Sequence, residues 1–333
     1  MIMNGAYFNG MDQTNGKNGL QTALDNIKGS VTTDYILMSL NVKGRPPNDP
    51  KGNDPRYADI NYGWNFGRIL ASEGKIAEGT RALLLPVVKA GVANGKLMRV
   101  LLGIGGAVWE DPPPEHPEYK QWTETFTNME KILDSGDPLK STLLDNFAAI
   151  VAAIKEITGR GNVGFDMDYE EESGALASAV SKATISLRLK IKDKLKYDCP
   201  ITFCPSFDLQ DDWIDALQRV YKWFSPQPVV GYNLQCYSGG GSNDPGQWTA
   251  KIKNATGTGV PDPDNFVWPI LSCSPQDNAY PVYKPDEVTG RLKNWNSTGF
   301  HSRGASLWCT LALKPQNPYT LTQYSNAFAQ GIA

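Results

Sequence analysis

The chain has 333 residues, 41% hydrophobic and 20% charged, which is enough apolar material for a large folded core. Its formal net charge is −3 and no basic stripe occurs, so a nucleic-acid partner is not expected. No apolar run approaches the roughly 20 residues that a membrane span needs, and the first ten residues do not read as a secretory signal.

Short apolar runs rich in β-forming residues alternate along the chain with helix-like segments. We predict strands at 3–9, 34–42, 97–106, 162–170, 201–207, 229–238, 266–273 and 304–311. The clearest helices are predicted at 77–92, 141–158, 174–196, 212–222, 284–295 and 319–330. This alternation predicts parallel βαβ units, and eight such units close into a (β/α)₈ TIM barrel. An open doubly wound sheet is the alternative, but no GxGxxG phosphate loop supports it.

Two long proline-rich connections, 43–66 and 107–120, follow the second and third predicted strands. Both come after the carboxyl ends of strands, where barrel enzymes keep their active sites. No internal repeat or linker occurs, so one domain is expected over 1–333. The connection after the seventh strand has no room for a large inserted domain.

The five cysteines form no CxxC pair, and four of them lie in apolar strand-like runs, which favours buried free thiols over disulfides or zinc. The two histidines are too few for a histidine-rich metal site and supply a Ser–His–Asp triad poorly. No metal and no cofactor are expected.

The fourth predicted strand carries three acidic residues at alternate positions, Asp166, Asp168 and Glu170. Side chains alternate across a strand, so the three carboxylates share one face, with Glu170 nearest the loop-bearing end. A solvated acidic face and a divalent-metal site are the alternatives. Parallel strands in α/β proteins are covered on both faces, which favours a ladder pointing into the barrel. Crowded carboxylates raise one another's pKa, so one of them keeps a proton that it can donate in catalysis.

These residues resemble the signature of glycoside hydrolase family 18, Asp-Gly-x-Asp-x-Asp-x-Glu on the fourth barrel strand. Here the stretch runs from Val163 to Glu170 and differs at its first position. Weaker similarities are Gly103-Ile104-Gly105-Gly106 on strand three, Gln235-Cys236-Tyr237-Ser238 on strand six and Trp308 on strand eight. The strand-six stretch is similar to that of the hevamine-like branch. Val163, Gly103 and Ser238 depart from the family pattern, and Ser238 is shorter than the asparagine or aspartate that the family has there.

The resemblance implies a retaining reaction in which the substrate's own N-acetyl oxygen attacks the anomeric carbon. Glu170 would protonate the leaving oxygen and later activate water, and Asp168 would hold the acetamido N–H, with Asp166 sharing its charge. Tyr237 would donate its hydroxyl to the acetamido oxygen. The expected substrate contacts are made by Gln235, Trp308, Tyr7, Gly105 and Gly106. Further aromatic sugar-binding candidates near the long loops and strand ends are Trp64, Trp109, Trp268, Tyr57 and Tyr62.

The expected activity is therefore endo-acting chitinase hydrolysis of β-1,4-linked N-acetylglucosamine polymers, with chitin or a related oligosaccharide as the partner. Two alternatives stay open: an endo-β-N-acetylglucosaminidase acting on N-glycans, and a non-catalytic carbohydrate-binding barrel. The presence of Glu170, Asp168 and Tyr237 together favours an enzyme. We expect a monomer that acts outside the cell. It would be exported either by a signal that has been removed or by another route. Glu171 faces away from the ladder and is expected to form a salt link or cap a helix.

Overall fold

A computed structural model of the protein describes residues 3–12, 19–46, 48–63, 68–106, 124–159, 162–171, 176–206, 209–237, 240–273, 283–313 and 318–332. Eight of its strands form a closed parallel barrel. They are β1 (Met3–Phe8), β2 (Asp34–Val42), β6 (Arg99–Gly105), β7 (Asn162–Asp168), β8 (Ile201–Phe203), β9 (Val229–Gln235), β10 (Val267–Ser272) and β11 (Gly304–Trp308). β1 pairs with both β2 and β11, which closes the ring. The predicted (β/α)₈ barrel and its eight strands are confirmed.

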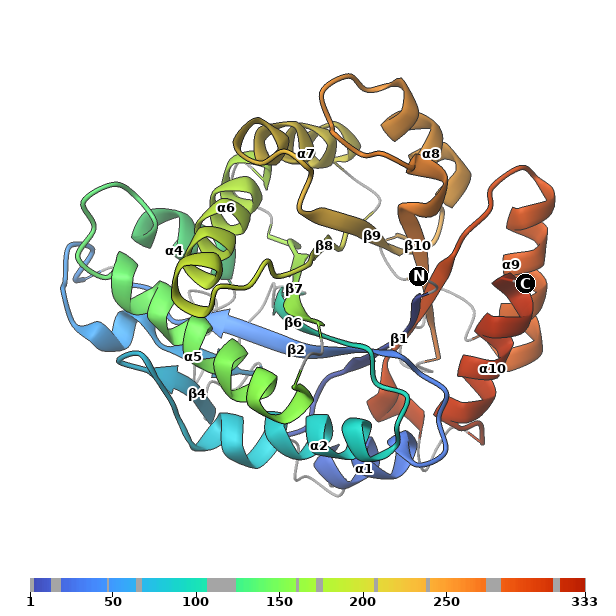
Figure 1. The fold of residues 1–333 in the computed structure, drawn as a ribbon, viewed down its shortest axis with the longest axis horizontal. Coiled ribbons are helices and arrows are strands. Elements are labelled where there is room, and N and C mark those ends of the chain that lie inside the picture. The colour runs from blue at the N-terminus through green and yellow to red at the C-terminus, as the bar shows by residue number, and fades with distance from the viewer. Residues whose placement is uncertain are drawn as a thin grey trace.

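Helices surround the barrel on its outside (Figure 1). They are α1 (Gly19–Ile27), α2 (Leu85–Ala93), α4 (Thr125–Ile132), α5 (Lys140–Thr158), α6 (Leu176–Leu195), α7 (Gln210–Trp223), α8 (Pro245–Asn254), α9 (Pro285–Ser297) and α10 (Leu321–Ile332). The sequence patterns predicted α5, α6, α7, α9 and α10 within about two residues but missed α1, α4 and α8. None of the described helices is long and apolar enough to cross a membrane.

The connection after β2 contains more regular structure than the predicted loop over 43–66. It includes β3 (Ile60–Tyr62), which pairs antiparallel with β2 and is followed by β4 (Arg68–Ser72) and β5 (Lys75–Ile76). These three strands extend the sheet beyond the barrel. By contrast, β10 ends at Ser272 and α9 begins at Pro285, so the connection after the seventh barrel strand is short, as predicted.

The barrel wall separates two apolar regions. Outward-facing side chains pack against the helices in one large cluster, whereas a smaller cluster lies inside the barrel. The inner cluster includes Tyr7, Met38, Cys204, Tyr237 and Trp268. All five cysteines are buried and free, which confirms the expectation of unpaired thiols.

A buried ion pair lies at the amino end of the barrel. Arg99 and Asp34 are the first residues of β6 and β2, and their Nε and Oδ1 atoms are 2.6 Å apart. The Arg99 guanidinium lies over the Trp268 ring at 5.2 Å from its centroid. Trp268 is the second residue of β10, so its side chain lies at the end of the barrel opposite to Glu170. The prediction that Trp268 contacts sugar is therefore wrong.

Candidate active site

The three carboxylates follow one another along the inner face of the barrel, as the alternation predicted. Asp166 and Asp168 belong to β7 and are 0% and 2% exposed, respectively. Glu170 follows two residues after Asp168 and keeps part of its surface exposed. The adjacent Phe165 and Met167 lie on the opposite face, in the outer core under the helices. The ladder therefore rises from a sealed interior toward the loop-bearing end.

Two glycines at the end of β6 allow the backbone to approach this ladder closely. Gly105 and Gly106 have φ angles of +90° and +108°, which side chains rarely adopt. The amide of Gly106 donates to the Asp168 carbonyl oxygen at 2.9 Å. A Cβ atom on Gly105 would lie 2.3 Å from that same oxygen. The structure therefore gives these glycines a backbone role beside Asp168.

Asp166 lies in a cradle of three donors from three different strands. Tyr7 Oη donates to its Oδ2 at 2.8 Å, while Thr202 Oγ1 and Asn233 Nδ2 donate to its Oδ1 at 2.5 and 2.8 Å. Burial raises the pKa of Asp166, whereas these three hydrogen bonds oppose that rise because they stabilise the carboxylate. The three donors suit an Asp166 carboxylate that stays charged and keeps its position.

Gln235 joins the two upper carboxyl groups. Its Nε2 donates to Glu170 Oε1 at 2.8 Å and to Asp168 Oδ1 at 3.0 Å. Burial, followed by the charges of Glu170 and Asp166, raises the pKa of Asp168 well above its ordinary value. Burial also raises the pKa of Glu170, and its hydrogen bond with Asp168 opposes this rise. Gln235 therefore links the upper pair directly above Asp166, and burial favours the protonated form of each of its two carboxyl groups.

Aromatic side chains lie beside the ladder. The Tyr237 ring stacks on Trp308, with centroids 5.6 Å apart and planes 11° from parallel. Tyr7 meets Trp308 edge-on at 5.5 Å. Three residues predicted at this site, Tyr237, Trp308 and Tyr7, are thus brought together by β9, β11 and β1.

Other aromatic candidates are not part of this group. Tyr62 is fully buried in the outer core, where its hydroxyl donates to the Phe8 carbonyl oxygen at 3.4 Å, so its prediction as a sugar contact is wrong. Tyr57 donates to Asp49 Oδ2 at 2.9 Å within its own loop. Trp64, Trp109 and Ser238 lie outside the described residues.

Thr202 and Asn233 are site residues that the sequence analysis missed. Asn233 lies two positions before Gln235 on β9, so strand alternation places both side chains on the inner face. That signal was present in the sequence. Thr202 on β8 carried no motif of its own and became visible only once β8 was paired beside β7, where Thr202 is opposite Asp166.

Glu171 caps a helix, as expected. Its carboxylate accepts hydrogen bonds from the backbone N–H of Phe126 and from both the N–H and the hydroxyl of Thr127 at the start of α4. Burial is the largest influence and raises the pKa of Glu171 to about 7, against an ordinary value of 4.5, although these hydrogen bonds oppose it. The folded protein therefore binds this proton more tightly than the unfolded chain does.

This linkage predicts that Glu171 makes the protein less stable as pH rises from about 4.5 to about 7. Glu171→Gln removes the titration, so we expect the wild type to lose up to roughly 3 kcal/mol more than the variant across that range. At pH 5, where the folded wild type still holds this proton, the variant should be about 1 kcal/mol less stable, since its amide nitrogen cannot accept from an N–H. Urea unfolding at pH 5 and pH 8 measures both. Equal pH dependence in the two proteins would contradict the prediction.

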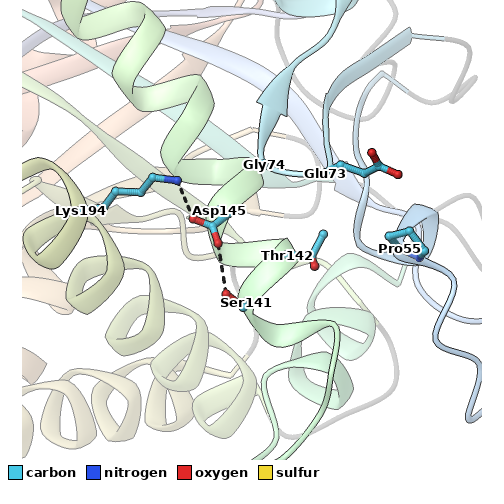
Figure 2. A pocket seen from close by; sticks show the side chains of 7 residues that line it. All are labelled: Pro55, Glu73, Gly74, Ser141, Thr142, Asp145 and Lys194. Atoms are coloured by element: carbon cyan, nitrogen blue, oxygen red, sulfur yellow. Dashed lines mark hydrogen bonds and ion pairs between the residues drawn. The ribbon is translucent and has the colours of Figure 1, made fainter.

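A hollow of about 480 Å³ lies on the outside of the barrel, between the start of α5 and the turn from β4 to β5. Asp145 lies in it, bonded to Ser141 and paired with Lys194 (Figure 2). None of its lining residues was predicted for the active site. Among the described residues, no group of three His, Cys, Asp or Glu side chains is arranged to hold a metal ion.

Comparison with known proteins gives a likeness in structure but none in sequence. No protein-family model and no curated protein matches the chain. A family 18 chitinase from Pseudoalteromonas aurantia is similar in structure, with a TM-score of 0.60, 16% identity and coverage of 98% of this chain and 99% of that one. The catalytic domain of a family 18 chitinase from the fern Peteris ryukyuensis has a TM-score of 0.55 and 14% identity, with 98% of each chain covered.

The Group IV chitinase of the insect Ostrinia furnacalis, in complex with allosamidin, is also similar, with a TM-score of 0.53 and 11% identity. The match covers 99% of both chains. These three structures come from a bacterium, a fern and an insect, and each matches nearly the whole length. The chain therefore has the barrel fold of family 18 chitinases, a class of glycoside hydrolases.

Proposed function

We propose that this protein is a family 18 glycoside hydrolase that cleaves β-1,4-linked N-acetylglucosamine polymers internally and retains the anomeric configuration. The observation that carries the proposal is the carboxyl pair of Asp168 and Glu170, which Gln235 Nε2 links above the anchored Asp166 and whose pKa values burial raises. A glycosidic bond needs a proton donor at its leaving oxygen, and a raised carboxyl pKa supplies one near neutral pH.

The reaction divides into two steps. Glu170 donates its proton to the glycosidic oxygen, and the C–O bond breaks while the substrate's acetamido oxygen bonds to the anomeric carbon. Asp168, which is already anionic when Glu170 holds the proton, binds the acetamido N–H and stabilises the positive charge of the oxazolinium intermediate. Glu170 then takes a proton from water, which attacks the anomeric carbon from the leaving-group side and reopens the ring.

The surrounding residues support this sequence of events. Tyr237 lies beside the ladder, where its hydroxyl suits the acetamido oxygen as charge develops there. Trp308 presents a flat aromatic surface, although Tyr237 covers one of its faces, so we place the sugar against the other. The short connection after β10 favours an open groove and therefore cleavage inside a chain.

The test is a product profile on a chitin hexamer labelled at one end, fully deacetylated chitosan and a glycoprotein with N-linked glycans. We expect the hexamer to yield several internal products and the deacetylated polymer to stay intact. Products shortened by one unit only would overturn internal cleavage, and cleavage of the glycoprotein alone would assign an endo-β-N-acetylglucosaminidase. Binding without any cleavage would show a non-catalytic barrel.

A further inference from the structure

Leu209 has a backbone conformation that leucine rarely adopts. Its φ and ψ angles are +69° and +30°, in the left-handed region, where a Cβ atom comes too close to the following carbonyl oxygen. Among the described residues, Glu73 and Lys196 are the other non-glycine residues with a positive φ. Glu73 lies in the turn between β4 and β5, and Lys196 directly follows α6, which are ordinary places for this conformation. Leu209 is the apolar exception.

The packing of Leu209 does not compensate for this strain. Its side chain is 49% exposed and belongs to neither of the two apolar clusters, so burial adds little stability. Its carbonyl oxygen accepts a hydrogen bond from the Trp213 N–H at 3.1 Å, which any residue at this position could do. The fold alone therefore gives no reason for a leucine here, and such conflicts are typical of functional sites.

The connection that contains Leu209 leaves the barrel beside the candidate active site. It joins the end of β8 to the start of α7, at the carboxyl end of the barrel. The exit of β8 is bonded to both strands that carry the upper site, because the Cys204 N–H donates to the Met167 carbonyl oxygen at 2.9 Å and the Gln235 N–H donates to that of Pro205 at 3.0 Å.

The first turn of α7 also acts on the residue that precedes Glu170. Burial is the largest cause of the raised pKa of Tyr169, and the charge of Asp212, three residues after Leu209, adds to it. Leu209 is thus an exposed apolar side chain on the face that carries the carboxylates. Four other large exposed apolar side chains lie at or near the opposite end of the barrel: Val92, Met98, Trp223 and Val230.

We propose that Leu209 is a specificity-determining residue that supplies an apolar contact to an N-acetylglucosamine unit away from the cleaved bond. The ring C–H groups and the acetamido methyl group of such a unit are apolar, so a leucine side chain suits them. Because Leu209 begins a helix of the outer layer, whereas the ladder lies inside the barrel, the unit in contact is not the reacting one. The proposal rests on the proposed function, which brings this polymer to the same face.

Leu209→Gly should have opposite effects on stability and on the binding of long substrates. Glycine adopts this conformation without strain, so the melting temperature should stay level or rise by up to about 2 °C. The affinity for an N-acetylglucosamine hexamer should fall about fivefold, whereas that for the trimer should not change. Calorimetric titration in the Glu170→Gln background measures both affinities without cleavage, and thermal unfolding measures the first effect.

Three further variants separate the side chain from the backbone. Leu209→Met keeps an apolar side chain and should retain the hexamer affinity within about twofold. Leu209→Asn tolerates the left-handed backbone but is polar, so it should lose as much affinity as the glycine variant. Lys196→Gly is the matched control, since it changes the same kind of backbone position at the amino end of the barrel and should leave both affinities unchanged.

Unchanged hexamer affinity in Leu209→Gly, or an equal loss for trimer and hexamer, would overturn the proposed contact. A melting temperature lowered by several degrees would show instead that the leucine serves the fold. If the Glu170→Gln protein binds the hexamer but the wild type cleaves no substrate, the proposed function fails, while the affinity series still decides the role of Leu209. Failure to bind the hexamer at all would overturn both.

Discussion

Glu170→Gln is expected to lower kcat on a chitin oligomer about 10³-fold, because the amide occupies the same volume but has no acidic proton to give to the leaving oxygen. The melting temperature should stay close to that of the wild type or rise slightly. Burial raises the pKa of Glu170, so ionising this group costs stability, and glutamine has no such charge. Steady-state kinetics and thermal unfolding of the same preparations measure the two effects.

The leaving group tests whether Glu170 acts as an acid rather than as a sugar contact. A 4-nitrophenyl glycoside needs little protonation to leave, so Glu170→Gln should lose markedly less activity on it than on the oligomer. Glu171→Gln is the control at the next position, since that side chain caps α4 on the outer side of β7. It should keep kcat. An equal loss on both substrates would argue against the acid role.

The barrel was predictable because its strands are short apolar runs separated by helices. The inward direction of the ladder was also predictable, since alternation places Asp166 and Asp168 on the face opposite to Phe165 and Met167. Both inferences depend on local periodicity, which a single sequence contains. They therefore located the main acidic groups without any knowledge of which strands are neighbours.

Contacts between residues of different strands were less predictable. Thr202 donates to Asp166 only because β8 pairs beside β7 in a register that the sequence does not display. Trp268 was counted as a sugar-binding candidate because it lies near a strand end, but that end is the amino end of β10, where the indole lies beside Arg99. The face of a residue follows from alternation, whereas its height in the barrel depends on where the strand begins.

The missed helices have a comparable cause. α1 has nine residues and α4 has eight, so each offers only two turns of periodic signal. α4 begins near a carboxylate from a distant segment, since Glu171 accepts from the N–H groups of Phe126 and Thr127. A helix whose first turn is capped by residue 171 cannot be recognised from the residues around 125 alone.

Asp168→Asn is the second substitution for which we expect a large effect, a fall in kcat of roughly 10²-fold on acetylated oligomers. The asparagine can hold the acetamido group, but it carries no negative charge to stabilise the oxazolinium intermediate. Asp166 does not replace that charge, because Tyr7, Thr202 and Asn233 hold its carboxylate in the interior. A loss in kcat with little change in KM would show that the charge acts in the transition state rather than in binding.

The acetyl group of the substrate provides the complementary test of the same step. The wild-type enzyme should cleave a partly acetylated chitosan only where an N-acetylated unit lies on the reacting side of the bond, since that unit supplies the attacking oxygen. Mass analysis of the new reducing ends identifies this unit. Equal cleavage after deacetylated units would require an enzyme nucleophile. Asp168 and Glu170 would then be the two candidates, and Asp168→Asn should in that case abolish cleavage rather than reduce it.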